Sequence, residues 1–248
     1  MSGHSKWHNI QATKSKADAA RGKIFTKIGR EIAVAVKLGG PDPNINSKLY
    51  DVIQKAKQNN MPNDNIQRSI KKAVGGEDGG NFDSITYEGY GTHGVAFIVE
   101  CLTDNRNRTA ADVRHLFDKF KGSLGSTGSV TYMFDYKGVV VVPKDDKSSE
   151  DNVMMLALDN GADDVNSDDE FYEITCAPEN LHKVSKAFED AGYEIVSSEA
   201  SYVPQNMIDL DKDAAISINK LVVALEDLDD VQEVYTNANL TVLDENEE

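Results

Sequence analysis

The charge of this chain changes sign partway along its length, and this change limits how the chain can be organised. Residues 1–73 contain fourteen Lys or Arg and five Asp or Glu, a balance of 14 − 5 = +9. The whole chain of 248 residues carries −16, so residues 74–248 carry −16 − 9 = −25. Such a charge distribution has an oriented field, which attracts polyanions to one end and repels them from the other. The sequence therefore predicts a basic lobe that meets a polyanion and an acidic body that does not.

Three amphipathic helices are predicted within the basic lobe. The first covers residues 23–38, where isoleucines recur with the helical period and a Gly-Gly-Pro sequence follows. The second is expected at about 47–60 and the third at about 64–74. A glycine-rich stretch at 75–80 then resembles a linker. Residues 1–78 are therefore predicted to form a three-helix domain.

The pattern of apolar residues becomes strand-like after the linker. Strands are predicted at 85–90, 95–102 and 129–134, with one helix between the last two. A sheet of this kind would have only one helix of its own. We therefore expect the C-terminal helix at 213–228 and the strand at 231–236 to complete it.

Residues 139–203 are predicted to form a second α+β unit within the first. Their order is β-α-β-β-α-β, the split βαβ or ferredoxin-like pattern. The predicted fold class is thus α+β multidomain: an N-terminal three-helix domain, then two α+β domains, one inserted into the other. The predicted bounds are 1–78, 79–138 together with 204–248, and 139–203 for the inserted domain.

The cations of the basic lobe are the first candidate binding residues. On the first helix Lys23, Lys27 and Arg30 lie opposite the apolar face, and only Glu31 nearby compensates their charge. A solvated surface is the usual role of such residues. The neighbouring helices and the N-terminal arm are also cationic, however, which favours contact with a phosphate backbone. The candidates in this lobe are Lys6, Trp7, Lys14, Lys16, Arg21, Lys23, Lys27, Arg30, Lys37, Arg68, Lys71 and Lys72.

Three candidates leave more than one interpretation open. Trp7, the only tryptophan, is either an anchor that packs the arm onto the helices or a platform for a base. Arg106 and Arg108 lie beside a predicted helix N-terminus, where an anion can bind. The two arginines could equally pair with acids of the same half of the chain.

No catalytic, metal or cofactor site is predicted. Residues 209–214 imitate the start of a calcium loop, but Ala214 stands where glycine is needed and Lys220 where glutamate is needed. The acidic cluster at 226–230 could hold magnesium in a nuclease or phosphotransferase, whereas a solvated acidic surface is the simpler interpretation. The histidines are dispersed. We expect a binding protein with no cofactor and no small-molecule substrate.

The expected compartment is the cytoplasm. Cys101 and Cys176 lie in separate apolar segments without a CxxC motif, which is typical of buried free thiols in a reducing environment. The N-terminal residues lack the apolar core of a signal peptide, and no apolar run approaches the length of a membrane span. No membrane partner is expected.

Five long motifs occur in order along the chain, at residues 3–10, 39–44, 87–91, 100–109 and 225–235. Together they closely resemble the YebC/PmpR family of probable transcriptional regulatory proteins, which also includes a mitochondrial translational activator. The resemblance implies a helical N-terminal domain, two α+β domains and a non-enzymatic cytoplasmic regulator that binds DNA. Two loops depart from the family pattern, with Thr92-His93 where Pro-Gly is common and Lys121-Gly122 where Gly-Gly is common.

The resemblance also implies an alternative partner. Members of the family are linked to translation on the ribosome, where they help with proline-rich sequences. The charge argument supports this alternative, because an acidic body of −25 would be repelled by long duplex DNA. A basic end suits a confined site on ribosomal RNA, whose shape is read through its backbone and 2′-OH groups. Promoter DNA and ribosomal RNA therefore both remain candidate partners.

Overall fold

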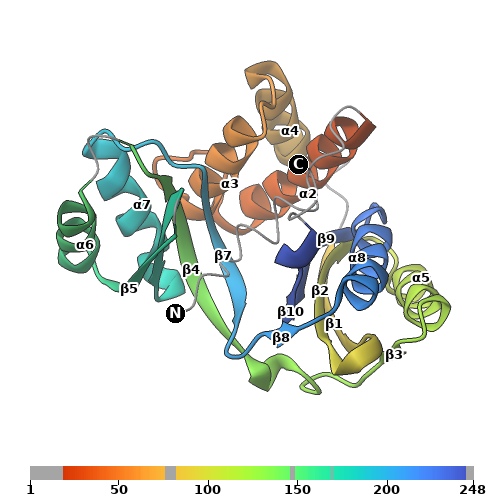
Figure 1. Ribbon diagram of the computed structural model, residues 1–248. Helices are drawn as coiled ribbons and strands as arrows, with labels where there is room; N and C mark the ends of the chain where they lie inside the picture. The colour runs from red at the N-terminus through yellow and green to blue at the C-terminus, as the bar shows by residue number, and fades with distance from the viewer. Residues whose placement is uncertain (1–18, 76–81, 146–148, 169, 244–248) are drawn as a thin grey trace.

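The computed structural model describes residues 19–75, 82–145, 149–168 and 170–243 (Figure 1). The described part of the N-terminal domain contains the helices α2 (Ala19–Gly39), α3 (Ser47–Gln58) and α4 (Asn63–Gly75). Their apolar faces meet in one core that contains Ile28, Ile32 and Leu49. The predicted three-helix domain is therefore confirmed.

Local chemistry explains the sharp turn between α2 and α3. Gly40 has a φ of +84°, a left-handed conformation that glycine adopts without strain, and its N–H donates to the carbonyl of Val36. Asn46 caps α3 by accepting a hydrogen bond from the N–H of Leu49 at 3.0 Å. The Asn46 amide also donates to the carbonyls of Ala35 and Gly40, which joins the end of α2 to the start of α3.

The second domain contains an antiparallel sheet in the order β3-β1-β2-β9. Strand β9 pairs with β2, so the C-terminal helix and strand complete this sheet as predicted. Helices α5 and α8 pack against the sheet through a core that contains Phe97, Phe117, Ile218 and Leu221. The elements are β1 (Asp83–Tyr90), β2 (Ala96–Thr103), α5 (Arg106–Lys119), β3 (Ser123–Leu124), α8 (Lys212–Glu226) and β9 (Val231–Thr236).

The strand predicted at 129–134 is wrong. Residues Thr131–Met133 form a 3-10 turn, and the short β3 occupies the edge of the sheet instead. The reason is the buried carboxylate of Glu88, which accepts hydrogen bonds of 2.7–2.9 Å from the N–H groups of Gly128, Val130 and Thr131. These N–H groups are therefore not available to a strand ladder.

The third domain lies in the chain between β3 and α8. Its antiparallel sheet has the order β5-β6-β4-β7, which is the ferredoxin-like arrangement predicted from the element order. The elements are β4 (Phe134–Pro143), α6 (Glu150–Asp159), β5 (Ala162–Ser167), β6 (Phe171–Cys176), α7 (Leu181–Asp190) and β7 (Ser197–Pro204). The α+β multidomain fold class with one inserted domain is thus confirmed. Strand β4 begins at Phe134 and crosses the predicted boundary between residues 138 and 139.

Two further short strands flank α8 and β9 in the chain. Strands β8 (Ile208–Asp209) and β10 (Ala238–Asn239) form a parallel pair. Figure 1 shows the helical domain at the top, adjoining both α+β domains.

Cys101 and Cys176 are buried free thiols, as predicted. Burial raises the thiol pKa of Cys101 to about 12 and that of Cys176 to about 11. None of the helices in the described part of the chain combines the length and hydropathy that a membrane crossing requires.

Candidate nucleic-acid interface

The N-terminal half of α2 contacts the C-terminal end of α8. The Lys23 ammonium forms an ion pair with the Asp227 carboxylate and donates to the Asp227 carbonyl at 3.2 Å. The Lys27 ammonium donates to the Glu226 carbonyl at 2.8 Å. Carbonyls at a helix C-terminus carry partial negative charge and lack helical partners, so lysines are suited to this position. Two predicted phosphate contacts therefore bind another domain of the same chain.

Arg30 contacts the second domain through several groups. Its Nη1 donates to the Asp230 carboxylate at 2.8 Å, to the Asp229 carbonyl at 2.6 Å and to the Leu102 carbonyl at 3.2 Å. Its guanidinium also lies 5.3 Å from the centre of the Phe82 ring, within cation–π range. Arg30 is therefore a docking residue between the helical domain and the second domain.

Asp230 receives hydrogen bonds from two domains. Besides Arg30, its buried carboxylate accepts from Arg108 Nη2 at 2.6 Å, from the Thr109 hydroxyl at 2.7 Å and from the Thr103 hydroxyl at 3.1 Å. Burial opposes ionisation of Asp230, but the hydrogen bonds from Arg108, Thr109, Arg30 and Thr103 outweigh it and lower its pKa. We call these five residues the Asp230 clamp.

Arg106 and Arg108 both pair with acids, one of the two interpretations that the sequence left open. Arg106 Nε lies 2.7 Å from the Asp83 carboxylate. Arg108 Nη2 lies 2.8 Å from Asp104 and also reaches Asp230. Both arginine side chains are largely exposed, and a role in binding nucleic acid stays a prediction.

Sequence reasoning missed Lys55, which lies where α3 meets α2 and β9. Its ammonium lies 3.0 Å from Glu31 and 2.9 Å from Glu233. Burial disfavours the ammonium, but the attraction of Glu233, Glu31 and Glu199 is larger and raises its pKa well above the usual value. No sequence signal connects Lys55 to Glu233, because they lie in different domains and far apart in the chain.

Helix α3 also contacts the third domain. The Tyr50 hydroxyl donates to the Glu189 carboxylate at 3.0 Å. The Asp51 carboxylate lies 3.1 Å from His182 Nδ1, and the rings of Tyr50 and His182 meet edge to face at 4.9 Å. The helical domain is thus held by polar contacts to both α+β domains, which composition and periodicity did not indicate.

Other predicted cations lie on the exposed surface of the helical domain. Arg68, Lys71 and Lys72 are exposed on α4, opposite the buried Ile66 and Ile70. Lys37 is exposed in the last turn of α2. Figure 1 shows α4 near the top of the molecule, away from both sheets. Arg68, Lys71 and Lys72 form what we call the α4 basic face, whereas Lys37 belongs to α2.

The remaining predicted candidates belong to the first 21 residues of the chain. Lys6, Trp7, Lys14 and Lys16 lie outside the described residues, and the side chain of Arg21 is not described either.

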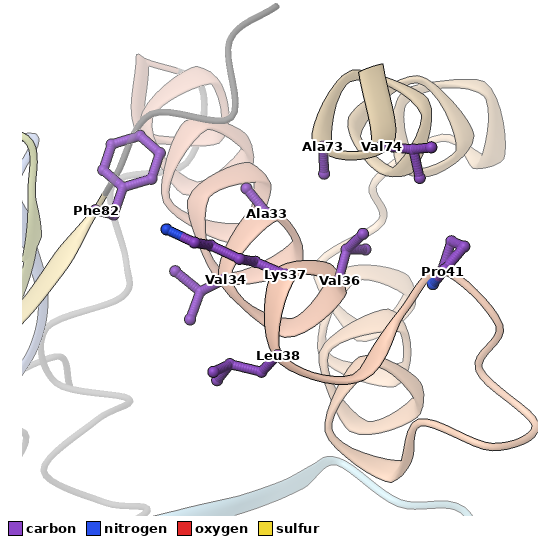
Figure 2. Close-up of a pocket in the computed structure, with 9 residues that line it drawn as sticks. All are labelled: Ala33, Val34, Val36, Lys37, Leu38, Pro41, Ala73, Val74 and Phe82. Atoms are coloured by element: carbon purple, nitrogen blue, oxygen red, sulfur yellow. The ribbon is translucent and has the colours of Figure 1, made fainter. Parts of the chain in front are cut away.

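An apolar groove of about 410 Å³ adjoins the α4 basic face. Figure 2 shows the Lys37 ammonium extended toward Phe82 on one side of α2, with Ala73 and Val74 of α4 on the other side. Among the described residues that line the groove, Lys37 is the only charged one. The groove can therefore accept an apolar group beside a cation. The other lining residues are Ala33, Val34, Val36, Leu38 and Pro41.

The acidic cluster at 226–230 is used for docking. Asp227 pairs with Lys23, and Asp230 forms the clamp. Within the described ranges, no group of three or more His, Cys, Asp or Glu side chains is arranged to hold a metal ion.

Two family models match nearly the whole chain. The model described as TACO1/YebC protein N-terminal domain matches residues 5–76, and the model described as TACO1/YebC second and third domain matches residues 82–238. The two matches divide the chain between α4 and β1, where the structure also passes from the helical domain to the first sheet.

Similar full-length proteins carry consistent names. A probable transcriptional regulatory protein from Acetivibrio thermocellus is 59% identical over 238 residues, covering 96% of this chain and 98% of the relative. Another from Thermoanaerobacter pseudethanolicus is 51% identical over all of both chains. The crystal structure of a conserved hypothetical protein from Aquifex aeolicus superposes with a TM-score of 0.82 at 43% identity, covering 94% of this chain and 96% of that one.

Proposed function

The chain belongs to the TACO1/YebC family, and from this premise we propose that it regulates gene expression by binding nucleic acid through its helical domain. The observation that carries the proposal is the α4 basic face, formed by Arg68, Lys71 and Lys72, with Lys37 also exposed at the end of α2. These side chains are exposed on a lobe of opposite charge to the rest of the chain. The names of the relatives, probable transcriptional regulatory proteins, support the same function.

The proposed contact is with the phosphate backbone. Lysine and arginine side chains on a helix face neutralise phosphates without reading bases, so affinity depends strongly on salt and weakly on sequence. The cations of the N-terminal arm, Lys6, Lys14 and Lys16, together with Arg21, would extend the surface. Arg106 and Arg108, which pair with acids of the second domain, are further candidates.

The test replaces Arg68, Lys71 and Lys72 together with glutamate. Fluorescence anisotropy with labelled RNA and DNA, over a series of salt concentrations, gives the affinity and its log–log slope. We expect weaker binding to every sequence and a slope smaller by about 0.7–0.9 for each lost phosphate contact. The matched control replaces Arg114, Lys119 and Lys183 with glutamate; these are exposed cations of the acidic domains, and the net charge changes equally. An unchanged slope in the first variant, or an equal loss in the control, would refute the proposed surface.

A ribosome-linked role in translation is the second candidate function. The observation that favours it is the charge of −25 on residues 74–248, which long duplex DNA would repel. Ribosomal RNA at a confined site would attract the helical domain and leave the acidic body to contact proteins. In this role the protein would assist the synthesis of proline-rich sequences in the cytoplasm.

Sedimentation separates the two functions. Lysate is run through a sucrose gradient at low and high salt, and the protein is detected in each fraction. Migration with ribosomes that is lost at high salt supports the translational role. Absence from ribosomal fractions, together with recovery of discrete promoter fragments, supports transcription.

We also propose that the protein is not an enzyme. A nuclease would need carboxylates that converge on a metal beside the phosphates, whereas Asp227 and Asp230 of the acidic cluster pair with cations. Labelled DNA and RNA incubated with the protein and magnesium should stay intact. Cleavage that disappears in Asp229→Asn would overturn this proposal.

A further inference from the structure

Helix α6 has a second apolar face, directed away from its own domain core. Val153 and Ala157 are buried against the sheet, as expected for one side of an amphipathic helix. On the outside Met154 is 40% exposed, Met155 65% and Leu158 54%. The spacings of three and four residues place these side chains next to each other on the helix surface. Since outward helical positions are normally polar, this stripe requires an explanation beyond the fold.

The surroundings of this stripe are strongly acidic. Residues 148–181 contain ten Asp or Glu and no Lys or Arg. Exposed carboxylates border both ends of α6, at Glu150 and Asp151 and at Asp159. Strand β5, which follows α6 and forms the edge of the sheet, adds the exposed Asp163 and Asp164. The apolar stripe is therefore enclosed by negative charge.

These charges exclude some partners and favour another. Phosphates of nucleic acid and anionic lipid head groups would be repelled by this surface. A protein segment with basic side chains around apolar anchors would gain both burial and charge complementarity. Methionine suits such a surface, because its flexible side chain adapts to differently shaped partners. We infer that the outer face of α6 docks a basic amphipathic segment of another protein.

A second copy of this chain is a less suitable occupant. The basic region of the chain is the helical domain, which is a different surface from α6. Docking of one copy on the next would then be head to tail, and such contacts continue into rings or filaments. The inference does not depend on the proposed nucleic-acid surface, because that surface lies on the helical domain and α6 belongs to the third domain.

The probe for this surface is a fluorescein-labelled peptide of leucine and lysine. Its leucines are placed at i, i+3, i+4 and i+7, and a scrambled peptide of the same composition lacks the apolar face. The full chain is titrated against each peptide by fluorescence anisotropy. We expect the helical peptide to bind at least about tenfold more tightly than the scrambled one. Equal binding of the two peptides would mean non-specific attraction to acidic residues and would overturn the inference.

Two triple variants locate the binding site. In the first variant Met154, Met155 and Leu158 are replaced by glutamine. Glutamine is a good helix former, so α6 should stay helical while its outer face becomes polar. The matched control replaces Leu38, Ile45 and Val74, three exposed apolar side chains of the helical domain, with glutamine. The α6 variant should lose at least about tenfold in affinity while the control binds like the wild type. Equal losses in both variants would refute the assignment to α6.

A charge variant keeps the inference testable if the α6 variant is unstable, and a further measurement tests which partner occupies the surface. Replacing Glu150, Asp151 and Asp159 with Gln, Asn and Asn keeps the apolar stripe and removes the negative charge at the ends of α6. The peptide should then bind more weakly at low salt. Unchanged binding of the peptide would contradict the role of charge. Analytical ultracentrifugation tests the other occupant. Wild-type self-association that is absent in the glutamine variant would assign the face to a second copy and overturn the inferred partner.

Discussion

Arg30 and Asp230 form an ion pair with 2.8 Å between Nη1 and Oδ1, although they lie 200 residues apart in the chain. The pair joins α2 of the helical domain to the residue before β9. Two of the motifs recognised in the sequence, at 100–109 and 225–235, meet here, because Thr103, Arg108 and Thr109 share the same carboxylate. In the clamp, Arg108 pairs with an acid of the same half of the chain, which is one of the two interpretations that the sequence left open.

Replacing Asp230 with alanine should lower the free energy of unfolding by about 3 kcal/mol. The substitution removes the Asp230 acceptor from the Arg30 guanidinium and from the hydroxyls of Thr103 and Thr109. Removing one partner of a buried ion pair is strongly destabilising. Urea denaturation followed by circular dichroism measures the change. Asp229→Ala is the control, because the Asp229 side chain is exposed and its carbonyl, which Arg30 uses, remains. Equal stability of the two variants would contradict the role of the clamp.

The clamp should also make the free energy of unfolding depend on pH in the acidic range. The pKa of Asp230 is lowered in the folded protein. Its contribution is therefore complete above the ordinary aspartate pKa of about 3.9 and is lost as pH falls below that value through the folded-state pKa. Urea midpoints measured between neutral pH and the acid limit should fall less steeply below about pH 4 in Asp230→Ala than in the wild type. Parallel curves for the two proteins would argue against this contribution.

Replacing Lys23, Lys27 and Arg30 together with glutamate should separate α2 from the end of α8. Three contacts to carbonyls and carboxylates would become repulsive. Hydrogen exchange measured by mass spectrometry should increase at the facing ends of α2 and α8. If exchange is unchanged while the salt dependence of nucleic-acid binding falls, these cations contact phosphates, as the sequence alone predicted.

Replacing Lys55 with methionine should lower the free energy of unfolding by roughly 1–2 kcal/mol, between the values typical of exposed and of buried ion pairs. The substitution keeps the aliphatic stem but leaves Glu31 and Glu233 near each other without their shared cation. Thermal and urea unfolding measure the loss. Lys57→Met provides the control on the same helix, because Lys57 is exposed. A loss of similar size in the control would mean that the change of side chain, not the loss of the partly buried cation, causes the effect.

Much of the fold could be predicted from periodicity. Helices bury one face every 3.6 residues and strands alternate, so the local pattern of apolar residues indicated the three helices and the ferredoxin-like unit. It also indicated that the C-terminal strand returns to the first sheet, which the pairing of β9 with β2 confirms. It failed at 129–134, because the competing partner, the Glu88 carboxylate, lies more than one element away.

The sequence by itself determined the charge division, because net charge is a sum over residues and does not depend on where they meet. It also determined the family, through motifs that are contiguous in the chain. Only the tertiary structure decided which of the described cations dock against another domain. Lys23, Lys27 and Arg30 share a helix face with Lys37, yet the first three meet α8 and the loop after it. Hydrogen bonds and ion pairs act over a few ångströms in space, so no periodicity along the chain could distinguish the docked cations from the exposed ones.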